Sequence, residues 1–320
     1  MFVSVIISFR NEEEVIPELI KRLRRVFAKD FKGKYELIFV NDASTDRSLE
    51  LLLEEKEKQN DVKIITMSRR FGIAPCIMAG MRYAKGDAVI YMDADLQDPP
   101  EIIPQLIQKW RDGADVVYTT RISRKGESSI KMWITKCAYR MIRCVSNVDL
   151  PVDSGDFKLL SRRVVNELIR LDEKDAYIKG LVSWVGFKQE NVLYTRDKRF
   201  AGKTHFSLLR SLGPFKSFLS GVTSFSSFPL YISFFIGMGI LLGALVYVIV
   251  VISMVVSGLI VPGWSFVLIG LLFIGGIQLI TVGIIGIYLA RVHSESKKRP
   301  TYIIDSMHGF TDAKHNTQSR

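Results

Sequence analysis

Three oxygen-bearing side chains, Asp93, Asp95 and Gln97, alternate along the chain directly after the apolar run 88–92. Two carboxylates at the carboxyl end of a buried strand can hold a hard divalent cation against a diphosphate. Mg²⁺ and Mn²⁺ take oxygen ligands of this kind and keep positions open for substrate phosphates. The spacing therefore predicts a Mg²⁺ or Mn²⁺ site at Asp93, Asp95 and Gln97, where the metal would stabilise charge on a departing diphosphate.

Asp42 is a second candidate, because it follows the strand-like run 35–41 and precedes the turn sequence Ala43-Ser44-Thr45-Asp46. An exposed carboxylate at this point can accept hydrogen bonds from a base or a ribose. The alternative is that Asp42 caps the next helix, although Ser44 or Asp46 could do so instead. Asp98 precedes Pro99 and Pro100, and this context predicts a helix cap.

Arginines near these positions matter because guanidinium groups pair with phosphates in a bidentate manner. Arg69 and Arg70 follow the third strand-like run, Arg121 follows the fifth, and Arg199 precedes an apolar region. A single basic residue is more often a solvated surface charge, but Arg121 follows a strand beside the predicted metal site. We therefore expect Arg121 to contact a substrate phosphate.

The first 120 residues alternate between strand-like and helical patterns. The strand-like runs are nearly continuously apolar, and the segments between them have one apolar face, as in 15–27 and 48–59. This alternation is typical of an α/β domain with a parallel sheet covered on both faces, in which ligands bind beyond the carboxyl ends of the strands. The predicted strands are 2–9, 35–41, 62–67, 88–93 and 115–119. Helices are also expected over 129–146 and from Ser161, with a short segment at 154–160 between them.

Residues 217–290 contain no Asp, Glu, Lys, Arg or His, and two apolar runs within this region, 229–256 and 264–290, each exceed the ~20 residues that cross a bilayer. We expect two transmembrane helices. Basic residues lie on both sides of the pair and none lies between them, which places both ends in the cytoplasm and the protein in the inner (plasma) membrane. Before the pair, apolar residues recur at helical spacing over 207–225, which predicts amphipathic helices on the membrane surface or packed against the domain.

The net charge of +11 is best explained by attraction to anionic lipid headgroups. No recognition motif for nucleic acid accompanies it, so a nucleic-acid partner is not expected. The three cysteines have neither metal-ligand nor disulfide spacing. Glycines in the apolar region would permit close helix packing within or between chains, so a homo-oligomer is an open alternative.

Several motifs, in this order, resemble family 2 glycosyltransferases. The early ones are Val3-Ser4-Val5-Ile6-Ile7 with Asn11-Glu12-Glu13-Glu14, Val40-Asn41-Asp42-Ala43-Ser44-Thr45-Asp46, and Asp93-Ala94-Asp95-Leu96-Gln97-Asp98-Pro99. Later ones, including Gly155-Asp156-Phe157-Lys158-Leu159-Leu160 and Lys179-Gly180-Leu181-Val182-Ser183-Trp184, resemble the polyprenyl-phosphate branch. Within that branch the chain looks most like bactoprenol glucosyltransferases, relatives of the dolichyl-phosphate mannose synthases.

The resemblance implies a Rossmann-like nucleotide-diphospho-sugar transferase (GT-A) domain over 1–206 and amphipathic juxtamembrane helices over 207–228. Transmembrane helices at 229–256 and 264–290 and a cytoplasmic tail at 291–320 would follow. The implied site has three parts. The donor would be bound by Asn11, Glu12, Asp42, Arg69, Asp93, Ala94 and Asp95. The lipid phosphate would be bound by Arg121, Lys131, Arg199, Lys203 and His205. The catalytic residues would be Asp95, Asp156 and Arg121.

The sequence departs from the family pattern at three places. Arg70 stands where the family commonly has Asn, and Met132, beside Lys131, stands where a basic residue is common. The loop before the apolar region often reads Gly-Glu-Ser-Lys-Tyr, whereas here it is Gly202-Lys203-Thr204-His205-Phe206. Either Lys203 or His205 would then supply the charge of the usual lysine.

The expected reaction is inverting attack of a polyprenyl (undecaprenyl) phosphate oxygen on the anomeric carbon of a nucleotide sugar. UDP-glucose is favoured by resemblance alone, and UDP-galactose, UDP-GlcNAc and GDP-mannose are alternatives. Such a product would serve cell-surface glycan modification with a flippase and a downstream glycosyltransferase as partners. A non-catalytic membrane adaptor with a transferase-like domain is the alternative outside enzymes, and the intact Asp42, Asp93 and Asp95 argue against it.

Overall fold

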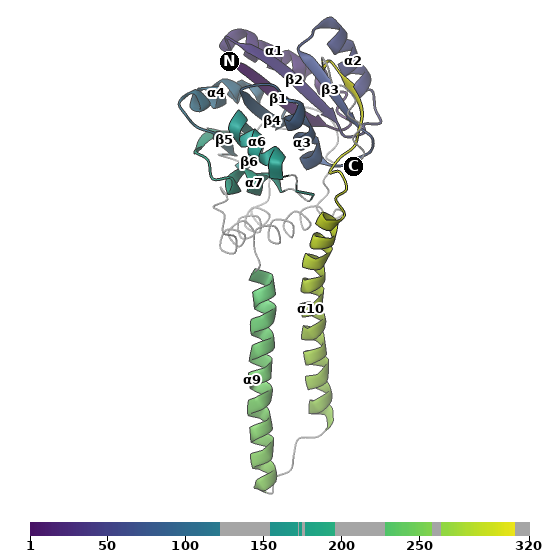
Figure 1. The fold of residues 1–320 in the computed structure, drawn as a ribbon, viewed down its shortest axis with the longest axis vertical. Coiled ribbons are helices and arrows are strands. Elements are labelled where there is room, and N and C mark those ends of the chain that lie inside the picture. The colour runs from purple at the N-terminus through teal and green to yellow at the C-terminus, as the bar shows by residue number, and fades with distance from the viewer. Residues whose placement is uncertain (122–153, 172, 175–176, 196–227, 258–263, 311–320) are drawn as a thin grey trace. The chain divides into compact units, whose positions relative to one another are not determined.

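The computed structural model describes residues 1–121, 154–171, 173–174, 177–195, 228–257 and 264–310. These residues fall into two units, one made of the sheet with its helices and residues 300–310, the other made of two long helices (Figure 1). In chain order the elements of the first part are β1 (Phe2–Phe9), α1 (Ile16–Asp30), β2 (Lys34–Asn41), α2 (Ser48–Lys58), β3 (Val62–Met67), α3 (Ile73–Tyr83), β4 (Ala88–Asp93), a 3₁₀ turn (Pro100–Ile102), α4 (Ile103–Arg111) and β5 (Val116–Arg121). The remaining elements are β6 (Ser154–Ser161), α6 (Arg162–Leu171), α7 (Ile178–Trp184), β7 (Gln189–Tyr194), α9 (Phe228–Val256), α10 (Trp264–Ser296) and β8 (Ile304–His308).

The described strands form one mixed sheet in the order β7-β5-β6-β4-β1-β2-β3-β8. The four strands β4, β1, β2 and β3 are parallel, as the sequence predicts, and β5 and β7 are also parallel. The expectation of a wholly parallel sheet is wrong at two places, because β6 runs antiparallel to β4 and β5, and β8 runs antiparallel to β3. Because β6 is antiparallel to β4, the first residues of β6 lie at the sheet edge where β4 ends.

Helices cover both faces of the sheet (Figure 1). On one face α1, α2 and α4 bury apolar residues at helical spacing, such as Leu19, Leu23 and Ile103, against alternate residues of the central strands. On the other face α3 packs on β1 and β2, and α6 packs on β4 and β6. Gly80 in α3 lies so close to β1 that a Cβ there would come within 2.4 Å of the Ile6 side chain. Both faces of the central strands are therefore buried, which leaves their carboxyl ends as the polar edge.

Residues 300–310 add a strand that the sequence analysis did not predict. β8 extends the sheet beyond β3, and the Ser68 N–H donates a hydrogen bond of 3.0 Å to the Ile303 carbonyl. Phe310 packs edge-on against Tyr83 and lies 5.1 Å beneath the Lys63 ammonium. The chain thus returns to the sheet after α10.

The two apolar runs are both helical, as α9 and α10. Among the described residues, one helix segment, Phe273–Ser296, is long and apolar enough to cross a membrane, and α9 contributes the shorter apolar stretch Phe235–Tyr247. The expectation of two transmembrane spans therefore stays a prediction. The helix expected over 129–146 and residues 207–227 of the expected amphipathic segment lie outside the described residues, and Phe228, the last residue of that segment, begins α9.

Candidate active site

Asp93 and Asp156 come together at the carboxyl end of β4. β4 and β6 pair as far as Tyr91 opposite Lys158, and Asp93 and Asp156 each lie two residues beyond this last pair, at the same end of the two strands. Desolvation by the surrounding protein, followed by the charge of Asp156 and then Asp95, raises the pKa of Asp93 to about 8. Carboxylates whose charges act on one another in this way repel, so the site favours a positive charge beside them.

The predicted ligands Asp93, Asp95 and Gln97 are all partly exposed, whereas Ala94, Leu96 and Asp98 between and after them are buried. Leu96 adopts a left-handed conformation (φ 56°), and the Gln97 N–H donates a hydrogen bond of 3.1 Å to Asp95 Oδ1. The predicted alternation is therefore present in the exposure of the side chains. Within the described part of the chain, no three His, Cys, Asp or Glu side chains converge closely enough to hold a metal.

Asp98 is not the helix cap that the sequence suggests. It is 1% exposed, and its Oδ1 accepts a short hydrogen bond from the Tyr194 hydroxyl on β7. The 3₁₀ turn that follows begins at Pro100 and has no side-chain cap. Asp98 instead joins the loop after β4 to a strand almost a hundred residues further along the chain.

Asp156 is partly exposed and pairs with Lys179, whose Nζ lies 3.0 Å from Asp156 Oδ2. A second lysine, Lys158, lies two residues along β6 and points to the same face, with 1% of its surface exposed. Desolvation and then the charge of Lys179 lower the pKa of Lys158 to about 8, against the opposing effect of Asp156. Two lysines, Lys158 and Lys179, therefore lie near the two carboxylates Asp93 and Asp156.

Asp42 is buried rather than exposed, which corrects the sequence expectation. Its carboxylate accepts hydrogen bonds from the backbone N–H groups of Phe71 (2.6 Å) and Gly72 (3.0 Å). These residues end the loop after β3 and lead into α3, so Asp42 does not cap α2. Burial, and then the nearby Asp42 carboxylate, raise the pKa of the Cys76 thiol in α3. Asp42 therefore fixes the loop that carries Arg69 and Arg70.

The loops after β1 and β2 are joined by hydrogen bonds. Asn11, with a positive φ of 54°, accepts a bond of 2.8 Å at Oδ1 from the Thr45 N–H, and its own N–H donates to Ser44 Oγ at 3.0 Å. The Glu12 N–H donates to Ser48 Oγ at 2.9 Å, and Glu12 is buried. Asn11 and Glu12, predicted from resemblance to bind the donor, therefore hold the backbone of this edge together.

Arg69 is exposed beside Asp42's loop, with its guanidinium 4.0 Å from the centre of the Phe71 ring and Nη1 donating to the Arg70 carbonyl at 3.1 Å. Arg121 is the last residue of β5, two strands away from β4 in the sheet. The structure thus places Asn11, Glu12, Asp42, Arg69 and Asp93 at loops of one sheet edge. The other predicted lipid-phosphate residues, Lys131, Arg199, Lys203 and His205, lie outside the described residues.

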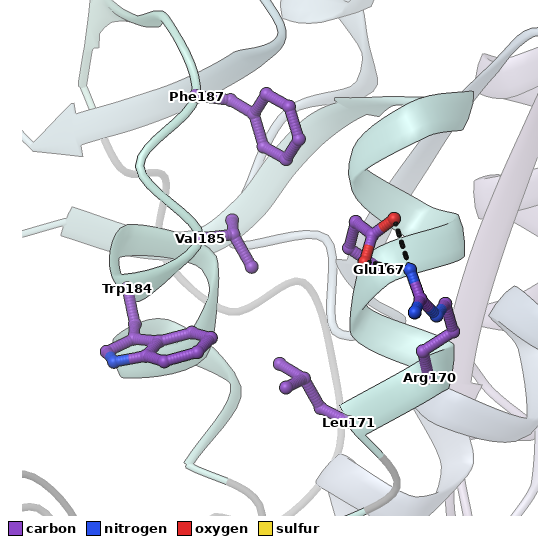
Figure 2. Close-up of a pocket in the computed structure, with 6 residues that line it drawn as sticks. All are labelled: Glu167, Arg170, Leu171, Trp184, Val185 and Phe187. Atoms are coloured by element: carbon purple, nitrogen blue, oxygen red, sulfur yellow. Dashed lines mark hydrogen bonds and ion pairs between the residues drawn. The ribbon is translucent and has the colours of Figure 1, made fainter.

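A pocket of about 430 Å³ opens between α6 and the end of α7 (Figure 2). Its walls include the exposed Trp184 and an ion pair of 2.9 Å between Glu167 and Arg170. None of the predicted site residues lines this pocket, so it does not locate the polar edge of the sheet.

Lys158 and Lys179 were not predicted as site residues from the sequence. For Lys158 a signal existed, because a charged residue within the otherwise apolar run Phe157–Leu160 is unexpected in a buried strand. No comparable signal marked Lys179, since its partner Asp156 lies 23 positions earlier in the chain.

Comparison with known proteins bears on this arrangement. A family model described as Glycosyl transferase family 2 matches residues 4–169. The chain is 42% identical over 308 residues to "Uncharacterized glycosyltransferase YkcC" of Bacillus subtilis (strain 168), covering 96% of this chain and 94% of that protein. It is 38% identical over 307 residues to "Prophage bactoprenol glucosyl transferase homolog" of Escherichia coli (strain K12), covering 95% and 98%. It is 37% identical over 307 residues to "Bactoprenol glucosyl transferase" of Shigella phage SfV, covering 95% and 98%.

Proposed function

Because this chain belongs to glycosyl transferase family 2, we propose that it is a membrane enzyme that transfers a sugar from a nucleotide-sugar donor to polyprenyl phosphate. The observation that carries the proposal is the cluster of three carboxylates at the carboxyl end of β4, where the charges of Asp156 and Asp95 both act on Asp93. Relatives at 37–38% identity over nearly the whole chain are named for glucosyl transfer to bactoprenol, which supports a lipid-phosphate acceptor and a hexose.

The oxygen donors at this edge fit Mg²⁺ or Mn²⁺. Asp93, Asp95 and Gln97 supply hard oxygen ligands, and a site with few protein ligands leaves coordination positions for the donor's phosphates. Desolvation, and then the charges of Asp156 and Asp95, raise the pKa of Asp93, and a divalent cation would offset the repulsion between these carboxylates. The metal would supply charge stabilisation for the departing nucleoside diphosphate.

The protein's own residues would bind and align the donor. Asp42 orders the backbone at Phe71 and Gly72, and this holds the exposed Arg69 guanidinium beside the sheet edge, where it can pair with a phosphate. Asn11 and Glu12 fix the neighbouring loops after β1 and β2. The nucleotide would therefore lie across β1, β2 and β4, at the point where ligands bind open α/β sheets.

Asp156 would lie beside the sugar and the acceptor. A phosphate monoester has a second pKa near ~6, so the acceptor oxygen is already largely anionic at pH 7 and needs no strong base. Asp156 then orients the acceptor for in-line attack on the anomeric carbon, which inverts the configuration as the nucleoside diphosphate departs. Arg121, Lys131, Arg199, Lys203 and His205 are proposed to hold the phosphates of the lipid.

The proposed acceptor and the surface of the long helices support a membrane location. Large apolar side chains along α9 and α10 are exposed, among them Phe235 (67%), Phe273 (65%) and Leu279 (75%). Burial of such apolar surfaces in a bilayer is favourable, whereas their exposure to water is unfavourable. We propose that both helices span the inner membrane, with the sheet unit and both termini in the cytoplasm, where basic residues flank the pair.

The donor is proposed to be UDP-glucose, and UDP-galactose, UDP-GlcNAc and GDP-mannose are the alternatives. A direct test incubates purified protein with polyprenyl phosphate, divalent metal and each radiolabelled nucleotide sugar in turn. Label should enter the lipid fraction from one donor well above the others. Equal incorporation of label into the lipid fraction from all four donors would contradict the proposal.

The non-enzymatic alternative is a membrane adaptor with a transferase-like domain. Replacing Asp95 by Ala in cells separates the two, because an adaptor would keep its cellular role while a transferase would lose its glycan product. Partnership with a flippase and a downstream transferase, and assembly into a homo-oligomer, are further parts of the proposal that co-purification would test.

A further inference from the structure

We propose that Lys179 is a positioning residue that holds Asp156 against the repulsion of Asp93, so that Asp156 stays aimed at the acceptor. This inference rests on the proposed function, because it assigns Lys179 to the alignment of that same reaction. Lys179 does not touch the reacting atoms in this account; it acts through Asp156.

The geometry that supports the inference is an ion pair between two separate elements. Lys179 Nζ on the first turn of α7 lies 3.0 Å from Asp156 Oδ2 on β6, and the two side chains are 24% and 35% exposed. Helix α7 holds the backbone of Lys179 in a fixed position, because its side chains Ile178, Leu181 and Val182 are buried. The lysine therefore reaches Asp156 from a fixed position, near enough for its charge to act on Asp93 as well.

A cation is needed at this position because the neighbouring strand carries like charge. Asp93 ends β4 at the edge where β6 begins and feels the charge of Asp156, and Asp95 and Asp98 add negative charge at the same edge. Asp156 is partly exposed, so without a partner it can rotate away from Asp93 into water. The ammonium of Lys179 attracts the Asp156 carboxylate, which offsets the repulsion by Asp93 and keeps the carboxylate beside the site.

An ordinary surface ion pair would contribute little, and the surroundings distinguish this one. Exposed pairs typically contribute ~0–1 kcal/mol because water screens them. Here both partners are mostly covered, and Lys158 lies in the same face of β6 with its side chain fully buried. Lys158 and Lys179 thus lie near the carboxylates of Asp93 and Asp156. This arrangement fixes the direction of the Asp156 side chain more than it adds stability.

The test compares three variants of the full-length protein in detergent or nanodiscs. Lys179→Met removes the charge, Lys179→Arg keeps it, and Lys188→Met removes an exposed lysine beyond the end of α7 as a matched control. In the transfer assay, kcat of Lys179→Met should fall about ten- to a hundredfold with the donor KM nearly unchanged, because alignment and not donor binding is lost. Lys179→Arg should recover most of kcat, and Lys188→Met should match the wild type.

Mn²⁺ binding without nucleotide, followed by electron paramagnetic resonance, gives a readout independent of activity. Loss of a positive charge next to the carboxylates should tighten Mn²⁺ binding about three- to tenfold in Lys179→Met and in neither other variant. If Lys179→Met keeps both the wild-type kcat and the wild-type Mn²⁺ affinity, the inference is overturned. If the wild type transfers no sugar, the proposed function fails, and the Mn²⁺ measurement alone then decides whether Lys179 controls the charge of this edge.

An exchange of the two charges separates positioning from simple structural support. The double variant Asp156→Lys, Lys179→Asp restores an ion pair between β6 and α7. If the pair is only structural, this variant should regain both stability and turnover. We expect stability to change little in this variant, since the pair fixes a direction more than it adds stability, while turnover stays at least about a hundredfold below the wild type because no carboxylate remains at position 156.

Discussion

Asp93, the last residue of β4, and Asp156, near the start of β6, lie at the same end of two antiparallel strands, and the charge of Asp156 acts on Asp93. Parallel strands bring only their carboxyl ends to the ligand-binding edge. An antiparallel neighbour brings its amino-terminal residues there as well, so residues more than sixty positions apart share one site. This relationship joins the predicted metal ligands to the residue proposed to orient the acceptor.

The first prediction concerns pH and the carboxyl of Asp93. Its pKa is about 8 in the folded protein against an ordinary value of 3.8, so between about pH 4 and 8 the folded state binds more protons than the unfolded state. Without divalent metal, the free energy of unfolding should therefore fall as pH rises through this window. Asp93→Asn should flatten the curve, as measured by denaturant unfolding at several pH values.

The control for this prediction is Asp112→Asn, at an exposed position after α4. That variant should keep the slope of the wild type. If the unfolding free energies of Asp93→Asn and the wild type depended on pH with the same slope, the pKa of Asp93 would not be raised in the folded protein. That result would contradict the prediction.

The second prediction concerns Asp42 and the loop after β3. Asp42→Asn replaces one of the two accepting oxygens by an amide N–H₂, which cannot accept the bond that Gly72 donates to Oδ2, and it removes the negative charge from the remaining bonds. The loss should cost about 1–3 kcal/mol of unfolding free energy and weaken nucleoside diphosphate binding by about tenfold. Calorimetric titration with UDP measures the binding, and unchanged affinity together with unchanged stability would contradict the assigned role.

The third prediction concerns the contact between Asp98 and Tyr194. Tyr194→Phe leaves a buried carboxylate without its hydroxyl donor, which should destabilise the protein by about 1–3 kcal/mol. A double-mutant cycle with Asp98→Asn isolates the pair, and the two losses should add to more than the loss of the double variant. Strict additivity would mean that the hydroxyl and the carboxylate do not stabilise each other.

The fourth prediction concerns the turn that ends β8. Gly309 has a φ of +83°, and a Cβ there would lie 2.8 Å from the Val62 carbonyl oxygen, whereas Gly113, with a φ of +96°, has open space at the same point. Both Gly→Ala variants lose about 1–2 kcal/mol from the left-handed conformation. Gly309→Ala should lose clearly more in denaturant unfolding, and equal losses would indicate that β8 does not pack firmly on β3.

The sequence predicted the central strands well because their signal is local. The run Ala88–Met92 is apolar, Asp93 ends it, and the structure places β4 at Ala88–Asp93. β8 was missed because Ile304–His308 is short and mixes polar with apolar residues, and because its partner β3 lies more than two hundred positions earlier. A strand whose pairing is so distant leaves no pattern in its own residues.

The site was predicted in its residue types but not in its contacts. The carboxylates at Asp93 and Asp95 were found from their position after a strand, and Asp156 from resemblance. The burial of Asp42 could not be foreseen, because its partners Phe71 and Gly72 are 29 and 30 positions away and are bound through the backbone N–H, which carries no side-chain signature. The pairing of Asp156 with Lys179 depends in the same way on how β6 and α7 fold together.

The measurement that tests the central claim most directly is sugar transfer by the purified protein with Asp95 intact and removed. Wild-type protein, Asp95→Ala and the surface control Asp112→Ala are incubated with Mg²⁺ or Mn²⁺, polyprenyl phosphate and radiolabelled UDP-glucose, and labelled lipid is counted. We predict transfer by the wild type and the control and a loss of about 10²–10³-fold or more for Asp95→Ala. Absence of transfer by the wild type from every nucleotide sugar, or full activity of Asp95→Ala, would contradict the account.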